Sequence, residues 1–263
     1  MKSVLDFARH KREGLPIGMV TSYDSWSARL AAQADVDCLL VGDSVAMVVH
    51  GHADTLHATM PMMELHTAAV RRGAPGMFVV ADMPFLSFRR GAAAAVEDAG
   101  ALMRAGASAV KLEGVVGHEE AIAQIVGSGI PVMGHLGLTP QSVHQLGGYR
   151  VQGRSAEQAA KILTDARRLE ELGVFALVLE CVPEQLAAEI TAALAIPTIG
   201  IGSGVKTSGQ VLVLHDLLGL QAEFRPRFAR RYVEGHEVVR DALVRYMADV
   251  RAARFPARDE VLC

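Results

Sequence analysis

Short apolar runs recur along the chain, separated by longer stretches whose apolar residues follow a helical spacing. Most of the short runs are apolar throughout, which is typical of strands covered on both faces in a parallel sheet, whereas half-buried strands alternate. We predict eight such strands, at residues 18–23, 38–43, 77–82, 109–114, 131–137, 176–181, 197–202 and 210–216.

The segments between the predicted strands carry the start and stop signals of helices. Residues 155–173 begin with Ser155, have Gln158 at the spacing of a capping box, and end at Gly173, a common helix terminator. Pro183 stands where the first residue of the next helix tolerates proline. Eight strand–helix repeats predict an α/β fold of the (β/α)8 TIM barrel type, with a doubly wound open sheet as the alternative.

The size of the chain is consistent with one barrel. It has 263 residues, of which 51% are hydrophobic, so it can bury a large core. No linker or low-complexity tract divides it. We predict one domain over residues 1–263, in which residues 225–263 form a C-terminal helical extension packed outside the barrel.

Composition narrows the class of protein. The chain has 26 basic and 29 acidic residues, and this near-balance gives no electrostatic reason to expect nucleic acid or an anionic membrane as a partner. Its apolar runs are too short to span a bilayer, and its charged start does not resemble a secretory signal. The three cysteines fit neither a disulfide framework nor a zinc site. We expect a cytoplasmic enzyme that acts on small molecules.

Four of the predicted strands end in or next to an acid, although a carboxylate is costly beside a buried run. These acids are Asp43, Asp82, Glu113 and Glu180. In a parallel barrel the carboxyl ends of all strands meet at one face, where the active site is built. The acids should therefore converge in space despite their separation in sequence.

Asp43, Asp82 and Glu113 belong to predicted strands two, three and four, which are neighbours around the barrel. Three close carboxylates repel one another unless protons or a cation neutralise them. Ligation by oxygen alone selects a hard ion, and we predict Mg²⁺. His135 stands at predicted strand five without a second zinc-type ligand. It could bind substrate or complete a buried polar network.

Lys111 and Glu113 are two residues apart, so their side chains should share one face of a strand. An ammonium beside a metal site suits a 2-oxo acid, whose enolate develops charge near these cations. Glu180, across the mouth of the barrel and among aliphatic neighbours, is our candidate for moving protons.

Each of these residues also has an ordinary structural explanation. A single acid at a strand end is often a helix cap or an arginine partner, and a single lysine is often a surface residue with a buried stem. Four acids at the same end of one barrel are harder to explain in this way. "GIGSG" at 200–204 lacks the dinucleotide-binding spacing and predicts a tight turn instead.

Several stretches at the predicted strand ends form a recognisable series. They are "LLVGDSVAMVVHGHADTL", "VVADMPFLSF", "MRAGASAVKLEG", "VMGHLGLTPQSV", "LVLECVP" and "IPTIGIGSG". In this order they resemble the ketopantoate hydroxymethyltransferase family over roughly residues 17–250. The resemblance implies transfer of a hydroxymethyl group from 5,10-methylenetetrahydrofolate to 3-methyl-2-oxobutanoate. The product is 2-dehydropantoate, on the route to pantothenate and coenzyme A.

The resemblance also implies roles for single residues. Three positions match the acids that the family associates with Mg²⁺: Asp43, Asp82 and Glu113. Four match its oxo-acid contacts: Asp43, Ser44, Asp82 and Lys111. Glu180 matches the catalytic proton acceptor, and the resemblance further implies a homo-oligomer, often a decamer.

Three positions depart from the family pattern: His57, Leu65 and Ser208. These departures bear on the shape of the nearby loops more than on the reaction. Two other functions stay open. One is a Mg²⁺-dependent carbon–carbon lyase or mutase of the isocitrate-lyase-like barrels, although those lyases generally need a reactive cysteine loop that this chain lacks. The other is a binding protein that has kept the pocket and lost the chemistry.

Overall fold

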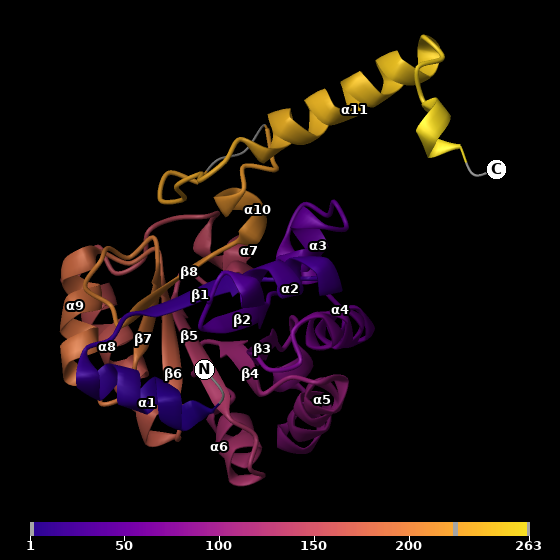
Figure 1. The fold of residues 1–263 in the computed structure, drawn as a ribbon. Coiled ribbons are helices and arrows are strands. Elements are labelled where there is room, and N and C mark those ends of the chain that lie inside the picture. Colours follow the sequence, from indigo (N-terminus) through magenta and orange to yellow (C-terminus); the bar gives the residue numbers. More distant parts are fainter. Residues whose placement is uncertain (1–2, 223–225, 262–263) are drawn as a thin grey trace. The chain divides into compact units, whose positions relative to one another are not determined.

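All eight predicted strands are present in the computed structural model, which describes residues 3–222 and 226–261. They are β1 (Ile17–Thr21), β2 (Cys38–Val41), β3 (Phe78–Asp82), β4 (Ala109–Glu113), β5 (Val132–Gly137), β6 (Ala176–Glu180), β7 (Thr198–Ile201) and β8 (Gly209–Leu212). Each strand pairs in parallel with the next, and β8 pairs with β1 (Figure 1). The predicted (β/α)8 barrel is therefore confirmed, and the open sheet is wrong.

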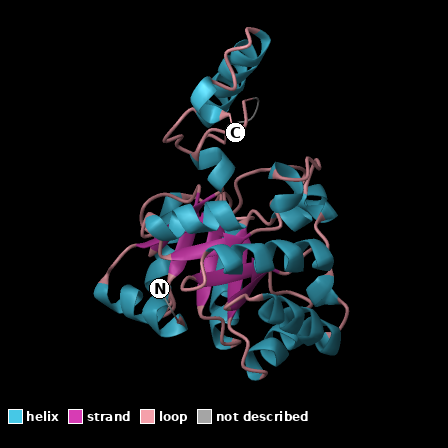
Figure 2. Cartoon of the chain, turned by 45° about the vertical axis from the view of Figure 1, so that its right-hand side comes forward, coloured by secondary structure: helices cyan, strands magenta, loops and turns pink. Residues whose placement is uncertain are grey.

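Helices surround the barrel strands (Figure 2). The α-helices up to residue 212 are α1 (Val4–Glu13), α2 (Ser25–Gln33), α3 (Val45–Val48), α4 (Met60–Gly73), α5 (Ala92–Ala105), α6 (Glu119–Gly127), α7 (Val143–Leu146), α8 (Ala156–Glu171) and α9 (Glu184–Ala193). Short 3₁₀ turns lie at η1 (Thr55–His57), η2 (Ser87–Arg89) and η3 (Pro140–Ser142).

Two predicted helix starts differ from the structure in detail. Ser155 does cap α8, because its hydroxyl accepts a hydrogen bond from the Gln158 amide at 3.2 Å. The Gln158 side chain, however, accepts from Arg154 N instead of Ser155 N, so the capping box is incomplete. Pro183 is the residue before α9 and not its first residue, because its ψ of 139° is extended.

The interior of the barrel is filled by alternate strand residues. Cys38 and Leu40 of β2 and Phe78 and Val80 of β3 are part of one buried cluster. At the amino ends of the strands, Phe7 of α1 packs its ring 5.2 Å from that of Phe78. Since this end is closed by aromatic packing, the carboxyl ends of the strands are the side on which a site can open.

Strand ends near residues 43 and 216 were predicted too long. β2 ends at Val41, so Asp43 lies in the turn that follows it. β8 ends at Leu212 and not at residue 216, because its last partner on β1 is Val20 and residues 214–217 form a short helix. A strand extends only as far as its neighbours supply backbone partners.

The chain divides into two compact units, residues 1–212 and 213–263. The second contains α10 (Leu214–Leu217), α11 (Gly235–Arg251) and the turn η4 (Arg258–Glu260). α11 lies within the range predicted for the C-terminal helical extension, and residues 223–225 lie outside the described part of the chain. In the described residues no helix has both the length and the apolar character needed to cross a membrane.

One side of α11 exposes apolar side chains at alternating spacings of four and three residues. They are Val239, Leu243, Tyr246 and Val250, each at least 40% exposed. A stripe with this spacing is the seam along which helices pack against one another. It is therefore a surface suited to covering by another helix.

Candidate active site

The structure brings the predicted acids of β2 and β3 into one buried group with Lys111. The backbone N–H of Asp43 donates to Asp82 Oδ2 at 3.0 Å, and Lys111 Nζ lies 3.0 Å from Asp82 Oδ1. The side chains of Lys111 and Asp82 are only 6% and 4% exposed. Because both charges are desolvated, removing either partner would leave a buried charge without compensation.

His135 connects the other two acids. Its Nδ1 lies 3.5 Å from Glu113 Oε1, and its Nε2 lies 3.2 Å from Glu180 Oε2. Lys111 Nζ is 3.3 Å from the same Nδ1. The register explains this arrangement, since Glu113 of β4 is paired directly with His135 of β5. Of the two roles left open for His135, the structure shows it in a buried polar network.

Ser44 and Tyr23 form a second pair of polar groups beside the acids. Ser44 precedes α3, and its Oγ is 2.8 Å from the hydroxyl of Tyr23, a side chain that is almost completely buried. Gly42 leaves room for this group, because a Cβ there would lie 2.8 Å from Ser44 Oγ and 3.7 Å from Asp82 Oδ2. Tyr23 was not predicted from the sequence; an aromatic hydroxyl just beyond β1 was the available signal.

Gln141 is a second residue that the sequence analysis missed. It lies in η3, the turn after β5, and is 7% exposed. Its side-chain amide donates to Asp43 Oδ2 at 2.9 Å and to the Met83 carbonyl at 3.0 Å, and its backbone N–H donates to Glu113 Oε2 at 3.0 Å. A neutral amide carries no charge signal, so only its position near a strand end pointed to it.

The end of β6 is held by its neighbours. Ser203 Oγ donates to the Leu179 carbonyl at 2.8 Å and accepts from Val182 N at 3.2 Å. The first two residues of "GIGSG" end β7, and Ser203 in the bend that follows braces the backbone around Glu180. Gly137 must be glycine here, because its φ is +95° and a Cβ would lie 2.2 Å from the Glu180 carbonyl oxygen.

Burial and mutual repulsion raise the pKa values of Asp43 and Asp82. Burial raises the pKa of Asp43 well above its usual range, and the charges of Asp82 and Glu113 raise it further. Burial also raises the pKa of Asp82, although Lys111 partly offsets the effect. The charged forms of Asp43 and Asp82 are therefore disfavoured in the metal-free site, and a nearby cation would stabilise them.

The two basic groups respond in the opposite direction. Burial disfavours the charged form of Lys111, but the surrounding carboxylates, Asp82 first, outweigh it and raise the pKa of Lys111. Burial and Lys111 disfavour protonation of His135, but hydrogen bonds to Glu113 and Glu180 outweigh both and raise the pKa of His135 to about 9. The surrounding carboxyl groups therefore favour the cationic form of each of the two groups.

His118, in the loop after β4, is buried and electrically neutral. Its Nδ1 lies 3.2 Å from the Val116 carbonyl, whereas its Nε2 has no hydrogen-bond partner and its ring packs 4.9 Å from Phe88. Burial, with a smaller contribution from the charge of Arg89, lowers the pKa of His118 to about 4. Protonation would bury an N–H without an acceptor.

We expect His118 to make the protein less stable in mild acid. Between pH 6.5 and pH 4 the unfolded chain binds a proton at this residue and the folded chain does not, so stability is complete above pH 6.5 and falls as pH decreases. The shift would be worth about 3 kcal/mol for a fully dry group, and after solvent screening we expect about 2 kcal/mol.

Denaturant unfolding at several pH values tests this expectation. His118→Gln should remove the acid-dependent loss, whereas the control His144→Gln, at a side chain that is 81% exposed, should keep it. If the free energies of unfolding of the wild type and His118→Gln changed equally with pH between pH 4 and pH 6.5, His118 would not be the cause of the acid-dependent loss of stability.

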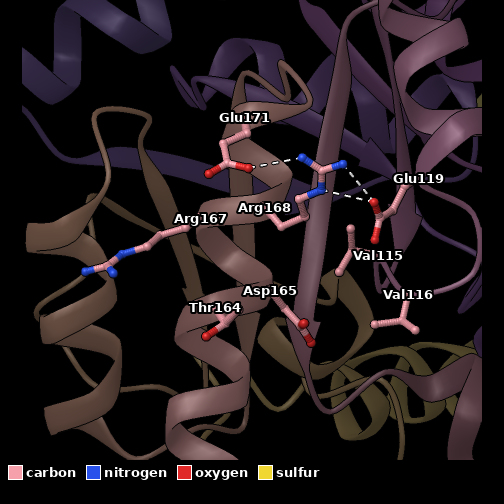
Figure 3. A pocket seen from close by; sticks show the side chains of 8 residues that line it. All are labelled: Val115, Val116, Glu119, Thr164, Asp165, Arg167, Arg168 and Glu171. Carbon is pink, nitrogen blue, oxygen red and sulfur yellow. Dashed lines mark hydrogen bonds and ion pairs between the residues drawn. The ribbon is translucent and has the colours of Figure 1, made fainter.

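A separate surface pocket of about 320 Å³ lies between α6 and α8 (Figure 3). Arg168 in this pocket is already paired, because it lies 2.9 Å from Glu119 and 3.1 Å from Glu171. These are exposed ion pairs of the kind that contributes little energy. None of the strand-end acids lines this pocket, so it is not the candidate site.

The three family departures have local roles. His57 Nδ1 lies 2.9 Å from Asp54, Leu65 is 63% exposed on α4, and Ser208 Oγ accepts a hydrogen bond from Thr198 N at 3.2 Å.

Within residues 3–222 and 226–261, no three His, Cys, Asp or Glu side chains are already arranged as the ligands of one metal ion.

Comparison with known proteins adds independent information. The sequence profile described as ketopantoate hydroxymethyltransferase matches residues 2–258. The chain is 52% identical over 260 residues to the 3-methyl-2-oxobutanoate hydroxymethyltransferase of Bdellovibrio bacteriovorus, covering 99% of both chains. It is 51% identical over 255 residues to the enzyme of the same name from Legionella pneumophila, covering 97% of both.

Solved structures of more distant proteins share the fold. A phosphonopyruvate hydrolase in complex with oxalate and Mg²⁺ superposes with a TM-score of 0.68 at 13% identity, covering 99% of this chain and 93% of that one. A 2,3-dimethylmalate lyase superposes with a TM-score of 0.61 at 18% identity, covering 100% and 92%. At such low identity these similarities establish the barrel alone.

Proposed function

Because this chain belongs to the ketopantoate hydroxymethyltransferase family, we propose that it transfers a hydroxymethyl group from 5,10-methylenetetrahydrofolate to 3-methyl-2-oxobutanoate, forming 2-dehydropantoate. The observation that carries the proposal is the buried group of Asp43, Asp82 and Lys111 at the carboxyl ends of the strands. The acids balance the charge of the Lys111 ammonium before substrate binds, so the buried ammonium is never left uncompensated. It is then in place to bind an anionic substrate. The product would serve pantothenate and coenzyme A synthesis.

Magnesium fits the charge of this site. Four carboxyl groups gather around one ammonium and one imidazole, and burial and mutual repulsion raise the pKa of Asp43, so a divalent cation that balanced the charge of the acids would be favoured there. The oxygen donors of Asp43 and Asp82, with Glu113 as the third predicted ligand, are those that Mg²⁺ prefers. When bound, Mg²⁺ would supply positive charge next to the carbonyl oxygen of the oxo acid.

The protein's own groups divide the remaining work. Ser44 and Lys111 orient the carboxylate and keto oxygens of the substrate, and Lys111 stabilises negative charge as it develops. Glu180 removes the proton from the carbon next to the carbonyl, while His135, 3.2 Å away, holds its carboxylate in place. That carbon then bonds to the methylene carbon of the folate as one of its two C–N bonds breaks. The oxygen of water replaces the second nitrogen at the same carbon and completes the hydroxymethyl group. The two folate nitrogens take up the proton removed from carbon and one proton of the water, and tetrahydrofolate leaves.

We also propose that the protein works in the cytoplasm as a homo-oligomer, such as the decamer that the family resemblance implies. The exposed apolar stripe of α11 supports this assembly, because a surface of this kind is commonly covered by another helix. A solution mass equal to that of one 28.0 kDa chain would contradict it.

The reaction can be tested directly. Purified protein should convert 3-methyl-2-oxobutanoate and 5,10-methylenetetrahydrofolate to 2-dehydropantoate in the presence of Mg²⁺. The control substrate is a 2-hydroxytricarboxylate, which a lyase of the isocitrate-lyase-like barrels would cleave. Cleavage of the control without hydroxymethyl transfer would replace our proposal with the lyase function. No turnover of either substrate would favour a binding protein.

The metal assignment predicts opposite effects of one substitution on binding and on stability. Asp43→Asn removes a charge that is repelled by Asp82 and Glu113, so the metal-free protein should unfold at equal or higher denaturant concentration. The same change should weaken Mg²⁺ binding by at least about tenfold, because one anionic ligand is lost. Calorimetric titration with Mg²⁺ measures the second effect.

Asp165→Asn is a matched control, since Asp165 pairs with Lys161 on the surface of α8. It should leave Mg²⁺ binding unchanged. If Asp43→Asn binds Mg²⁺ as tightly as the wild type, Asp43 is not a ligand.

A further inference from the structure

We propose that Gln141 is a positioning residue that sets the orientation of the acids from the loop after β5. The inference rests on the proposed function, because it concerns the same metal-facing carboxylates. The three hydrogen bonds of Gln141 reach the ends of three consecutive strands: Asp43 after β2, Met83 after β3 and Glu113 of β4. No other residue of the described chain makes such a set of bonds.

The bonds of Gln141 determine which carboxylate oxygens remain for a ligand. Its amide takes Oδ2 of Asp43, so the other oxygen, Oδ1, is the one left to turn towards a cation. Its backbone N–H takes Oε2 of Glu113, while Oε1 of that residue faces His135. Its bond to the Met83 carbonyl holds the backbone immediately after Asp82. Gln141 therefore fixes one oxygen of Asp43 with its side chain and one oxygen of Glu113 with its backbone, and it holds the backbone after Asp82.

The chemistry of a carboxamide explains why glutamine suits this position. It offers two N–H donors in one plane, and here each one has an acceptor. It also adds no charge to a site that is already too negative. Glutamate would replace a donor with a further repelling carboxylate, and methionine would fill a similar volume without donating any hydrogen bond.

Ligand orientation by supporting hydrogen bonds typically changes metal affinity by a factor of about 10–100. We therefore expect Gln141→Met to weaken Mg²⁺ binding by at least about tenfold in calorimetric titrations without oxo acid. At saturating Mg²⁺, the kcat of Gln141→Met should return towards the wild-type value, whereas its KM for the oxo acid should return much less. If the substitution had only disturbed the packing of the loop, added Mg²⁺ would not restore kcat.

Two further variants separate hydrogen bonding from shape. Gln141→Glu keeps the shape of the side chain and should weaken Mg²⁺ binding at least as much as Gln141→Met. Gln152→Met makes the same chemical change in the same loop but removes only a bond to the Arg150 carbonyl, and it should bind Mg²⁺ like the wild type. Thermal unfolding of each sample shows whether the fold is retained.

The outcomes distinguish this inference from the proposed function. If the wild type binds Mg²⁺ and both Gln141 variants bind it equally well, the positioning role is wrong and the metal assignment stands. If the wild type does not bind Mg²⁺, the metal assignment and the role of Gln141 are both wrong. Equal weakening in Gln152→Met would also overturn the role, because the effect would then belong to the loop in general.

Discussion

Glu180→Gln is expected to lower kcat by about 10²- to 10⁴-fold, while Mg²⁺ and the oxo acid still bind. Glutamine preserves the shape of the side chain but cannot accept a proton from carbon. Glu180 is the best placed of the acids for this task, because its side chain is 15% exposed whereas those of Asp82 and Glu113 are each 4% exposed. It can therefore reach a substrate in the mouth of the barrel.

Proton exchange measures this step without the folate. In deuterium oxide with Mg²⁺ but no donor, the wild type should exchange the hydrogen on the carbon next to the carbonyl of 3-methyl-2-oxobutanoate, as followed by NMR. Glu180→Gln should exchange it much more slowly, whereas the control Glu184→Gln, at an exposed position on α9, should not differ from the wild type. Undiminished exchange in Glu180→Gln would assign the proton transfer to another group.

The second large effect concerns Lys111. Lys111→Met should destabilise the protein by about 3–5 kcal/mol, because it removes one partner of a buried ion pair and leaves Asp82 uncompensated. The control Lys161→Met breaks a surface pair of Lys161 and Asp165, for which about 0.2–1 kcal/mol is typical. Urea unfolding of both variants at neutral pH gives the comparison.

The pH dependence of Lys111→Met identifies the cause of the loss. Without Lys111 the pKa of Asp82 rises further, so the folded variant takes up a proton more readily than the unfolded chain. Its deficit relative to the wild type should therefore shrink as pH falls from neutral, and grow as pH rises. A deficit that does not change with pH would point to lost packing instead of an uncompensated carboxylate.

The sequence alone determined the architecture and the side on which the site lies. Continuous apolar runs predict strands covered on both faces, and eight of them with intervening helices close into a parallel barrel. Once the topology is known, the acids at residues 43, 82, 113 and 180 must gather at one end of the barrel. Their contacts in the structure agree with this. Periodicity is a property of the local chain, so the strands and helices can be predicted, whereas the pairing of β8 with β1 in the structure excluded the open sheet.

Only the tertiary structure decided which group each acid contacts. Gln141 and Asp43 are 98 residues apart, and their hydrogen bond depends on the course of a loop that no periodic pattern describes. The place of His135 between Glu113 and Glu180 depends on the register of β4 against β5. The early end of β8 has the same origin, because it depends on where β1 stops pairing. Contacts between distant side chains follow from register and packing, which form only when the barrel closes.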